Sequence, residues 1–220
     1  MKNIFNNGTI DIKNNKKLYT INSSFKTGKS YIIDYLSNVN LNLFGYSDDY
    51  TYTFNANSVL SLSQVMENVK NDGLQYHEVS NYLYNIYDII EYLENNKKTV
   101  ISLDIDDFIV IDREKIIFIN EDKIVDIEKN DQIIIKKPIQ RNTLISPELK
   151  LINKLPYTIN HKQVYFNIGM LIYYMLFDSL LDTANIYNDV KMNLIKETSI
   201  YWFLHRCLEK DINKRTLLLI

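Results

Sequence analysis

The spacing of hydrophobic and polar residues divides the chain into a strand-rich N-terminal third and a mainly helical remainder. Apolar and polar residues alternate over 8–13 and 17–21, which predicts two strands. Residues 41–56 predict two more strands around a Ser-Asp-Asp turn. Between these pairs, a short helix is expected from about Ser30, whose hydroxyl can cap it, to about Asn38.

After the second strand pair, the apolar positions follow a helical period. Residues 61–71 predict a short amphipathic helix that ends at Asp72-Gly73, and residues 75–95 predict a longer helix with one apolar face. Residues 99–127 are rich in Ile and Val with polar breaks, so short strands and turns are expected there. A less regular stretch runs to Leu155. The last third is predicted to be helical at 164–177, 187–196 and 198–209.

Composition narrows the possible functions. The 220 residues are 46% hydrophobic with a net charge of -2, so a sizeable core is possible and no basic surface for nucleic acid is indicated. The longest apolar run, 164–177, is too short to span a membrane. A single cysteine, Cys207, excludes an internal disulfide, and the polar N-terminus does not resemble a signal peptide, so an intracellular location, cytoplasmic or nuclear, is expected. Abundant Asn, Ile, Lys and Tyr indicate an AT-rich genome.

The stretch TGKS lies between a predicted strand and a predicted helix, as in a phosphate-binding P-loop. Gly28, Lys29 and Ser30 match the end of the motif Gly-x-x-x-x-Gly-Lys-Ser/Thr, but Ser23 occupies the position of the first glycine. The rest of the chain lacks the alternation of strands and helices that builds a parallel sheet. Two interpretations stay open: a P-loop nucleotide enzyme, or a turn in which Ser30 caps the helix.

Five segments, in order along the chain, resemble the eukaryotic protein kinase family. Residues 39–68 resemble the part that leads from strands four and five through the hinge, and 84–96 resemble the helix before the catalytic loop. ISPELK (145–150) resembles the Ala-Pro-Glu motif that closes the activation segment. Residues 165–177 resemble the buried helix at the centre of the large lobe. RCLEKDINKR (206–215) resembles the late Cys-Leu-x-x-Asp-Pro-x-x-Arg motif.

The resemblance implies an α+β, two-lobed protein kinase-like fold. A reduced strand-rich N-lobe would occupy 1–57, and a mainly helical C-lobe would occupy 58–220. In the family, the Glu of Ala-Pro-Glu forms a buried ion pair with the Arg of the late motif. By resemblance, these residues are Glu148 and Arg215, so a structural ion pair between them is expected.

Phosphoryl transfer by a kinase needs groups that hold ATP, and most of their positions are altered here. Gly8 is the only glycine before Gly28, and a loop without glycines cannot approach the phosphates closely. Lys13 in IDIK resembles the lysine that holds the phosphates, with an exposed strand lysine as the alternative. The helix glutamate that orients this lysine has no equivalent, because the only acid in 25–38 is Asp34.

The catalytic loop is altered as well. The family's His-Arg-Asp corresponds to Ser102-Leu103-Asp104, which makes Asp104 the candidate base. The magnesium-binding Asn falls at Ile109, or at Phe108 if the alignment shifts by one residue. The Asp-Phe-Gly motif falls at Asn120-Glu121-Asp122. Asp122 or Glu121 would be the metal ligand there, and an ordinary solvated turn is the alternative.

The residues that resemble the structural motifs of the family are present, whereas the residues at its catalytic positions differ. The resemblance therefore implies a catalytically inactive pseudokinase that acts as a protein-interaction or regulatory scaffold. On this interpretation no catalytic residue and no cofactor are expected, and the partner is a protein such as an active kinase, a kinase substrate or a larger assembly. Two enzyme hypotheses stay open. One is a divergent Ser/Thr-type kinase that uses ATP, magnesium and Asp104, with Asp122 or Glu121 on the metal. The other is the P-loop enzyme around Gly28, Lys29 and Ser30.

Overall fold

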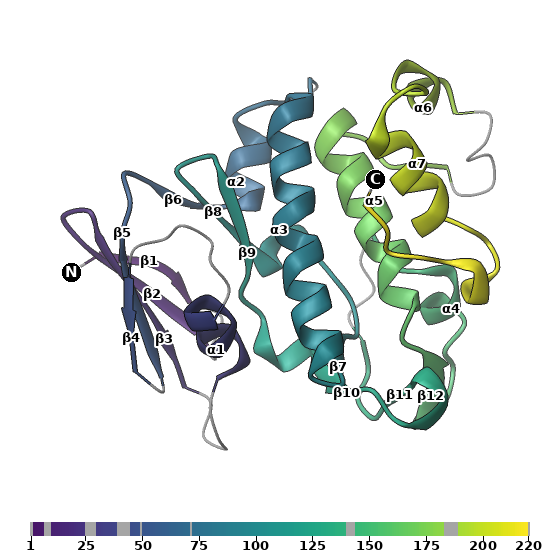
Figure 1. Ribbon diagram of the computed structural model, residues 1–220, viewed down its shortest axis with the longest axis horizontal. Coiled ribbons are helices and arrows are strands. Elements are labelled where there is room, and N and C mark those ends of the chain that lie inside the picture. The colour runs from purple at the N-terminus through teal and green to yellow at the C-terminus, as the bar shows by residue number, and fades with distance from the viewer. Residues whose placement is uncertain are drawn as a thin grey trace.

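The N-terminal part of the chain forms one antiparallel sheet with a helix beside it (Figure 1). The structure is a computed structural model that describes residues 2–6, 10–24, 30–38, 45–48, 50–70, 72–139, 144–182 and 189–219. Helix α1 (Tyr31–Asn38) packs against β4 and β5. The strands pair in the order β1-β2-β3-β5-β4, with bounds β1 (Lys2–Asn6), β2 (Ile10–Asn15), β3 (Leu18–Ser23), β4 (Gly45–Ser47) and β5 (Thr51–Asn55).

Alternating apolar residues explain why this sheet packs on one face. In β2 the buried positions are Ile10 and Ile12, and in β3 they include Tyr19 and Ile21. Successive side chains of a strand point to opposite faces, so these residues share one side of the sheet. They belong to the same core as the buried face of α1.

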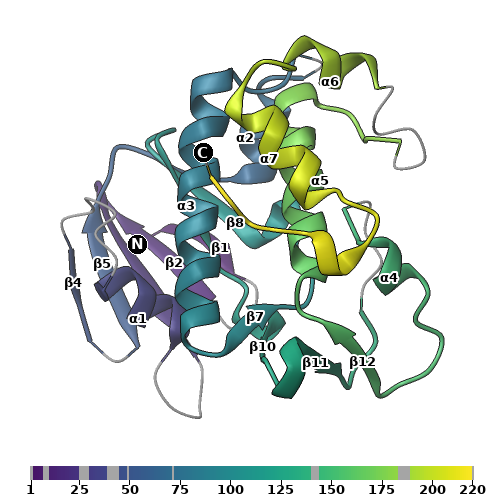
Figure 2. The same ribbon diagram turned by 45° about the vertical axis from the view of Figure 1, so that its right-hand side comes forward.

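The remainder of the described chain is mainly helical and is built around the small antiparallel sheet β6-β8-β9. Helix α3 lies on β9 and also contacts α5, which contacts α7 in turn (Figure 2). The bounds are β6 (Val59–Ser61), α2 (Leu62–Glu67), α3 (Tyr76–Asn95), β8 (Phe108–Ile111), β9 (Lys115–Phe118), α5 (Gln163–Phe177), α6 (Val190–Leu194) and α7 (Ser199–Cys207).

Helix α5 is buried along almost its whole length, and a glycine allows the end of α7 to approach it. A Cβ at Gly169 would lie 2.9 Å from the Leu208 side chain and 3.1 Å from the Cβ of Cys207. A larger residue at this position would therefore require the Leu208 side chain or the end of α7 to shift.

Short strands and 3-10 turns connect the helices and support a second apolar cluster. The strand pairs are β7 (Lys98–Val100) with β10 (Ile124–Asp126) and β11 (Gln132–Ile135) with β12 (Tyr157–Asn160), and helix α4 spans Pro147–Lys150. The turns are η1 (Ile105–Asp107), η2 (Glu121–Lys123), η3 (Lys129–Asp131) and η5 (Ile212–Lys214). The buried members of this cluster are Ile133, Ile135, Ile145, Leu149 and Ile159.

The expected α+β class is confirmed, and every described strand pairing is antiparallel. The expectation of an irregular stretch up to Leu155 was wrong in part, because β11 and α4 lie there. Strands β1, β6 and β12 were not expected either. β6 and β12 are three and four residues long, which is too short for a clear alternation.

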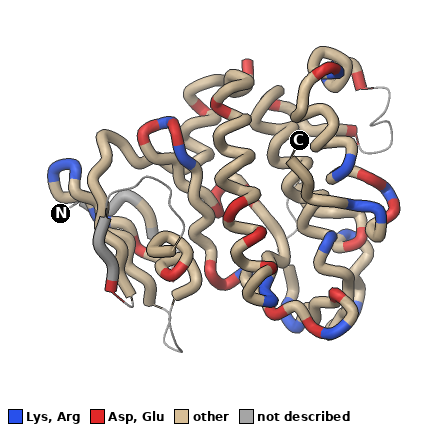
Figure 3. The backbone as a smooth tube through the Cα atoms, viewed as in Figure 1, with Lys and Arg blue, Asp and Glu red and all other residues tan. Residues whose placement is uncertain are grey.

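Charged residues of both signs occur along the whole of the described chain (Figure 3). Figure 3 shows basic and acidic residues interspersed along the tube, in keeping with the small net charge. Among the described residues, no helix combines the length and the hydrophobicity needed to cross a membrane.

Candidate functional site

A buried carboxylate, Asp107, organises the segment that resembles the catalytic loop. Asp107 is 3% exposed and lies at the end of η1. One of its oxygens accepts from the backbone N–H of Asp104 at 2.7 Å and from Lys123 Nζ at 2.6 Å, and the other accepts from Asn120 Nδ2 at 2.7 Å. We call Asp107, Asn120, Lys123 and the Asp104 amide the Asp107 cluster. Burial raises the pKa of Asp107, although Lys123 and the other donors oppose this effect.

The candidate base, Asp104, stands at the edge of this cluster. It is half-buried and has extended backbone just before η1. The two residues that align with the magnesium-binding Asn, Phe108 and Ile109, lie in β8 with at most 1% exposure. Phe108 packs edge-on against Phe118. The segment that resembles the family's catalytic loop therefore runs into an apolar strand, which offers no metal ligand at these two positions.

A second buried carboxylate, Glu121, joins the N-terminal sheet and α1 to the turn after β9. Glu121 is 2% exposed and accepts hydrogen bonds from Ser23 Oγ at 2.8 Å, from Ser30 Oγ at 2.5 Å and from the backbone N–H of Ile32 at 3.1 Å. We call these four groups the Glu121 clasp. Ser23 ends β3, and Ser30 precedes α1.

The electrostatics of the Glu121 clasp follow from its place at a helix start. The first N–H groups of a helix have no partner within the helix, and their positive end favours an anion. Ser30 also accepts from the backbone N–H of Ile33 at 3.2 Å, so it caps α1 as expected from the sequence. Hydrogen bonds from three donors compensate the cost of taking this carboxylate out of water.

The expectation of an ordinary solvated turn at Asn120-Glu121-Asp122 was wrong for its first two residues. Asn120 is half-buried in the Asp107 cluster, and Glu121 is buried in its clasp. Only Asp122, the candidate metal ligand, is exposed. In the part of the chain that the structure describes, no group of three His, Cys, Asp or Glu side chains is arranged to hold a metal ion.

The candidate nucleotide lysine, Lys13, makes a surface ion pair within its own strand. Its Nζ lies 2.8 Å from Asp11 Oδ2, and its side chain is 43% exposed. Asp34, the only acid of α1, accepts a hydrogen bond from the Tyr92 hydroxyl on α3. The alternative of an exposed strand lysine fits this geometry.

The candidates of the P-loop hypothesis are only partly visible. Gly28 and Lys29 lie outside the described residues, and Ser30 belongs to the Glu121 clasp. A P-loop sits between a strand and a helix of a parallel α/β sheet. The neighbouring strand β3 pairs antiparallel with β2 and β5, which speaks against that architecture.

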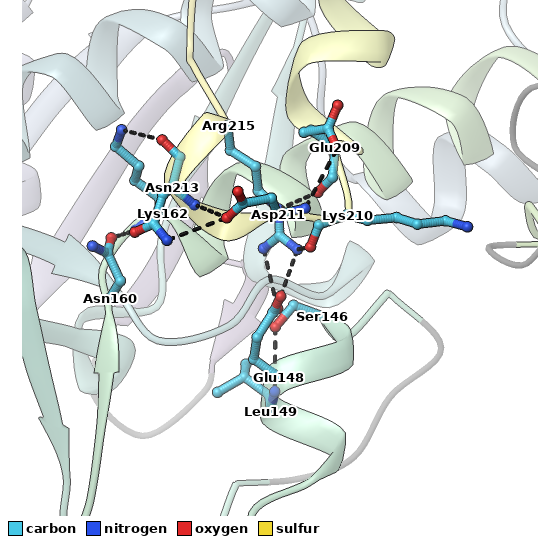
Figure 4. A network of polar contacts seen from close by, with 10 residues as sticks. All are labelled: Ser146, Glu148, Leu149, Asn160, Lys162, Glu209, Lys210, Asp211, Asn213 and Arg215. Atoms are coloured by element: carbon cyan, nitrogen blue, oxygen red, sulfur yellow. Dashed lines mark hydrogen bonds and ion pairs between the residues drawn. The ribbon is translucent and has the colours of Figure 1, made fainter.

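Glu148 and Arg215 form a bidentate ion pair (Figure 4). Arg215 Nη2 lies 2.6 Å from Glu148 Oε1, and Nη1 lies 3.1 Å from Oε2. Arg215 has no exposed surface; its Nε donates to the Glu209 carbonyl at 2.7 Å, and its guanidinium lies 4.9 Å from the ring centre of Phe166 on α5. The pair thus anchors the segment after α7 to α4 and α5.

Ser146 explains why Glu148 stands where it does. The Ser146 side chain accepts from the backbone N–H of Leu149, and Pro147 occupies the first turn of α4. This Ser-Pro start fixes the helix and points the carboxylate of its second residue at Arg215.

Sequence reasoning found Glu148, Arg215 and the cap Ser30, but it missed the roles of Ser23, Asp107 and Lys123. Asp107 lies within a run of three acids around 104–107, and nothing in the spacing marks which one is buried. The sequence was compared with protein-family models and with curated proteins, and neither comparison gave a match.

Proposed function

We propose that the chain is a non-catalytic, protein kinase-like interaction module, a pseudokinase in function. In this proposal, the antiparallel sheet with α1 corresponds to a reduced N-lobe over 1–57. The helices around α5 with the β6-β8-β9 sheet correspond to a C-lobe over 58–220. The ordered resemblance of five segments supports this assignment, as does the Glu148–Arg215 pair at the positions that the resemblance implies.

The observation that carries the proposal is the state of the two buried carboxylates. They lie in the segments that resemble the catalytic loop and the metal-binding motif. Asp107 is bound by Lys123, Asn120 and a backbone amide, and Glu121 is bound by two serines and a backbone amide. Magnesium at such sites is bound by one or two carboxylate groups of the protein together with oxygens of the substrate phosphates. In this structure, the carboxylate oxygens of Asp107 and Glu121 accept hydrogen bonds from protein groups instead, so we infer a structural role for them.

Two enzyme hypotheses compete with this proposal, and each would need a rearrangement. A divergent kinase with Asp104 as base would have to bind magnesium through exposed Asp122, or break the Glu121 clasp. A P-loop enzyme would need Ser30 to leave α1 and Glu121 for a metal.

The test is a thermal melt of the full chain with and without millimolar ATP and magnesium. A ligand at a hundred times its dissociation constant stabilises the folded state by about 2.7 kcal/mol. For a chain of this size, that free energy corresponds to a rise in Tm of roughly 5–10 °C. We expect no rise, while an active protein kinase in the same buffer serves as the positive control.

A magnesium-dependent rise in Tm would contradict the proposal and favour an enzyme. Melts with magnesium alone and with ATP alone separate metal binding from nucleotide binding. The variants Asp104→Asn and Lys29→Ala would then decide between the enzymes: loss of activity in the first marks a kinase, and loss of ATP binding in the second marks a P-loop.

A further inference from the structure

Two amide side chains, Gln163 and Asn167, interrupt a helix that is otherwise apolar. The other residues of α5 are aliphatic, aromatic, methionine or Gly169. Both amides lie in the core and have no exposed surface. Because they are four residues apart, they share one face of α5 and stand on successive turns. Burying an amide is costly unless it is hydrogen-bonded, so both side chains need partners.

Gln163 has partners at one end of its amide only. Its Nε2 donates to the carbonyl of Ile101 at 2.6 Å and to that of Val100 at 3.1 Å, which joins the start of α5 to the end of β7. Both of these partners are acceptors, so the orientation of the amide is fixed and Oε1 lies on its other side. Oε1 is enclosed and has no hydrogen-bond partner among the described residues.

Asn167 has no hydrogen bond at either end of its amide. Nδ2 and Oδ1 are both enclosed, and neither atom meets a partner in the part of the chain that the structure describes. One helix face therefore carries a donor, Asn167 Nδ2, and two acceptors, Gln163 Oε1 and Asn167 Oδ1. The large majority of buried polar side-chain atoms in folded proteins are bound either by protein or by ordered water.

We propose that an internal water molecule is bound between Gln163 and Asn167. Side chains one turn apart on a helix have Cβ atoms about 5–6 Å from each other, a separation that one water can bridge. The water would accept from Asn167 Nδ2 and donate to Gln163 Oε1, and its second proton would bind Asn167 Oδ1. A buried water typically makes about three hydrogen bonds, which these atoms supply.

The chemistry of these atoms favours water over an ion. A metal cation takes acceptor atoms as ligands, and here it would also face the protons of Asn167 Nδ2. Neither amide carries a charge that could compensate an ion for the loss of its hydration. Water both donates and accepts, as a neutral set of one donor and two acceptors requires.

The water would extend a polar connection that Gln163 already makes. The Nε2 end of this side chain holds two carbonyls at the end of β7, and the Oε1 end would be joined through water to the next turn of α5. Gln163 is then fixed from both ends, and with it the backbone at Val100 and Ile101 that leads toward Asp104. The site does not depend on the kinase-like assignment, because it follows from the hydrogen bonds of two amides.

A crystal structure of the full chain at a resolution that shows ordered waters tests the proposal directly. We expect density for a water at about 2.7–3.2 Å from both Asn167 Nδ2 and Gln163 Oε1. Water magnetic relaxation dispersion tests it in solution, because an enclosed water exchanges slowly and adds to the dispersion. Asn167→Leu should lower the amplitude by the contribution of this water. Asn167→Ser should keep that contribution, since its hydroxyl can bind the water and its shorter side chain leaves room.

Asn193→Leu, at an exposed asparagine on α6, is the matched control and should keep the amplitude of the parent. Thermal melts add a second readout. Asn167→Leu displaces the water and leaves Gln163 Oε1 without a partner, so its Tm should fall by about 2–6 °C. The Tm of Asn193→Leu should stay within about 2 °C of the parent.

Three results would overturn the proposal: density in which the two amides bond directly to each other without a water, equal dispersion amplitude in the parent and Asn167→Leu, or a higher Tm in Asn167→Leu. A higher Tm would mean that the Asn167 amide is unpaired in the native protein, since replacing an unpaired buried group by an apolar group of similar shape is neutral or stabilising. The crystal structure of the parent needs no variant, so it decides the question even if Asn167→Leu does not fold.

Discussion

The Ser30 hydroxyl donates a hydrogen bond to the carboxylate of Glu121, which lies 91 residues further along the chain. The same hydroxyl accepts from the backbone N–H of Ile33, so one side chain both caps α1 and ties it to the turn after β9. With Ser23 as a further donor, Glu121 fixes the sheet and α1 against the rest of the molecule. Glu121 thus adds a polar connection between two parts that also share one hydrophobic core and the Tyr92–Asp34 hydrogen bond.

Replacing Glu121 should destabilise the protein markedly. Glu121→Ala leaves Ser23, Ser30 and the Ile32 amide without their acceptor, and hydrogen bonds to a charged group are worth about 1.5–3 kcal/mol each in net stability. Because the contributions of neighbouring hydrogen bonds are not additive, we expect a total loss of about 2–4 kcal/mol in the free energy of unfolding. Urea denaturation followed by circular dichroism measures it.

The exposed neighbour provides the control for this prediction. Asp122→Ala should change the free energy of unfolding by no more than about 0.5 kcal/mol, because the side chain is solvated. Equal losses in the two variants would show that Glu121 does not carry the contacts described above.

Breaking the Glu148–Arg215 pair should be at least as costly. Glu148→Ala strands a guanidinium that has no exposed surface, and the loss of one partner of a buried ion pair costs about 3–5 kcal/mol. Arg215→Lys keeps a positive charge opposite Glu148, so it should be less destabilising than Glu148→Ala. It should still be less stable than the parent, because an ammonium group cannot make the two parallel hydrogen bonds. Urea unfolding of both variants measures the difference.

Lys214→Ala serves as the neighbour control, since Lys214 is exposed beside Arg215. We expect it to unfold like the parent within about 0.5 kcal/mol. If Glu148→Ala changed the free energy of unfolding as little as Lys214→Ala does, the ion pair would not contribute to stability.

Local signals in the sequence were sufficient to place most elements, and the resemblance to the kinase family supplied one long-range contact. The alternation in β2 and β3 and the helical period of α3 are strong because one face of each is buried. Glu148 and Arg215, which are 67 residues apart, were paired because their segments resemble two motifs that form an ion pair in the kinase family. Neither spacing nor charge alone would have paired them.

The Glu121 clasp and the Asp107 cluster could not be predicted in the same way. Their donors come from four separate segments, and burial is decided by how those segments pack. Asp104, Asp106 and Asp107 are chemically alike in the sequence, yet only Asp107 is buried. A sequence pattern encodes which face of an element is apolar, but it does not encode which polar side chain will be enclosed when two elements meet.

Removing the cation of the Asp107 cluster should make stability depend more strongly on pH. The pKa of Asp107 is already raised by burial, and Lys123 holds it down. Lys123→Met should raise this pKa further above its value in the unfolded chain. The folded state then binds the proton more tightly than the unfolded state does, so stability falls as pH rises through that interval.

Denaturation of Lys123→Met and parent between about pH 4.5 and pH 7.5 checks this prediction. The variant should lose most stability at the upper end and regain part of it at the lower end. Lys70→Met, at an exposed lysine, is the matched control and should follow the parent throughout. A loss independent of pH would mean that Lys123 acts through packing and not through the charge of Asp107.

Another carboxylate, Glu94, is partly buried at the end of α3. It accepts from the Tyr165 hydroxyl at 2.9 and 3.1 Å, and His161 Nε2 lies 3.6 Å away. Burial raises the pKa of Glu94, and Asp131 adds to the shift. The Tyr165 hydroxyl, His161 and Lys162 act in the opposite direction.

The sign of this shift predicts the behaviour of Glu94→Gln. A carboxyl group whose pKa is higher in the folded state than in the unfolded state lowers the free energy of unfolding when it ionises. For Glu94 this loss of stability develops as pH rises from its pKa in the unfolded chain through its pKa in the folded chain. The glutamine variant carries no such penalty, so its free energy of unfolding relative to the parent should rise with pH over about pH 4.5–7.5. Denaturant midpoints at several pH values measure the slope.

A second variant tests the electrostatic effect of His161 on Glu94. His161→Gln removes a positive partner of Glu94, so the pKa of Glu94 should rise further and the decline of stability with pH should steepen. If the decline instead disappeared in His161→Gln and persisted in Glu94→Gln, the imidazole would be its source. Glu91→Gln, at an exposed acid one turn earlier on α3, should retain the parent's pH dependence. Because Glu94, Tyr165 and His161 connect α3 to α5, such a result would place the pH response at the contact between the two central helices.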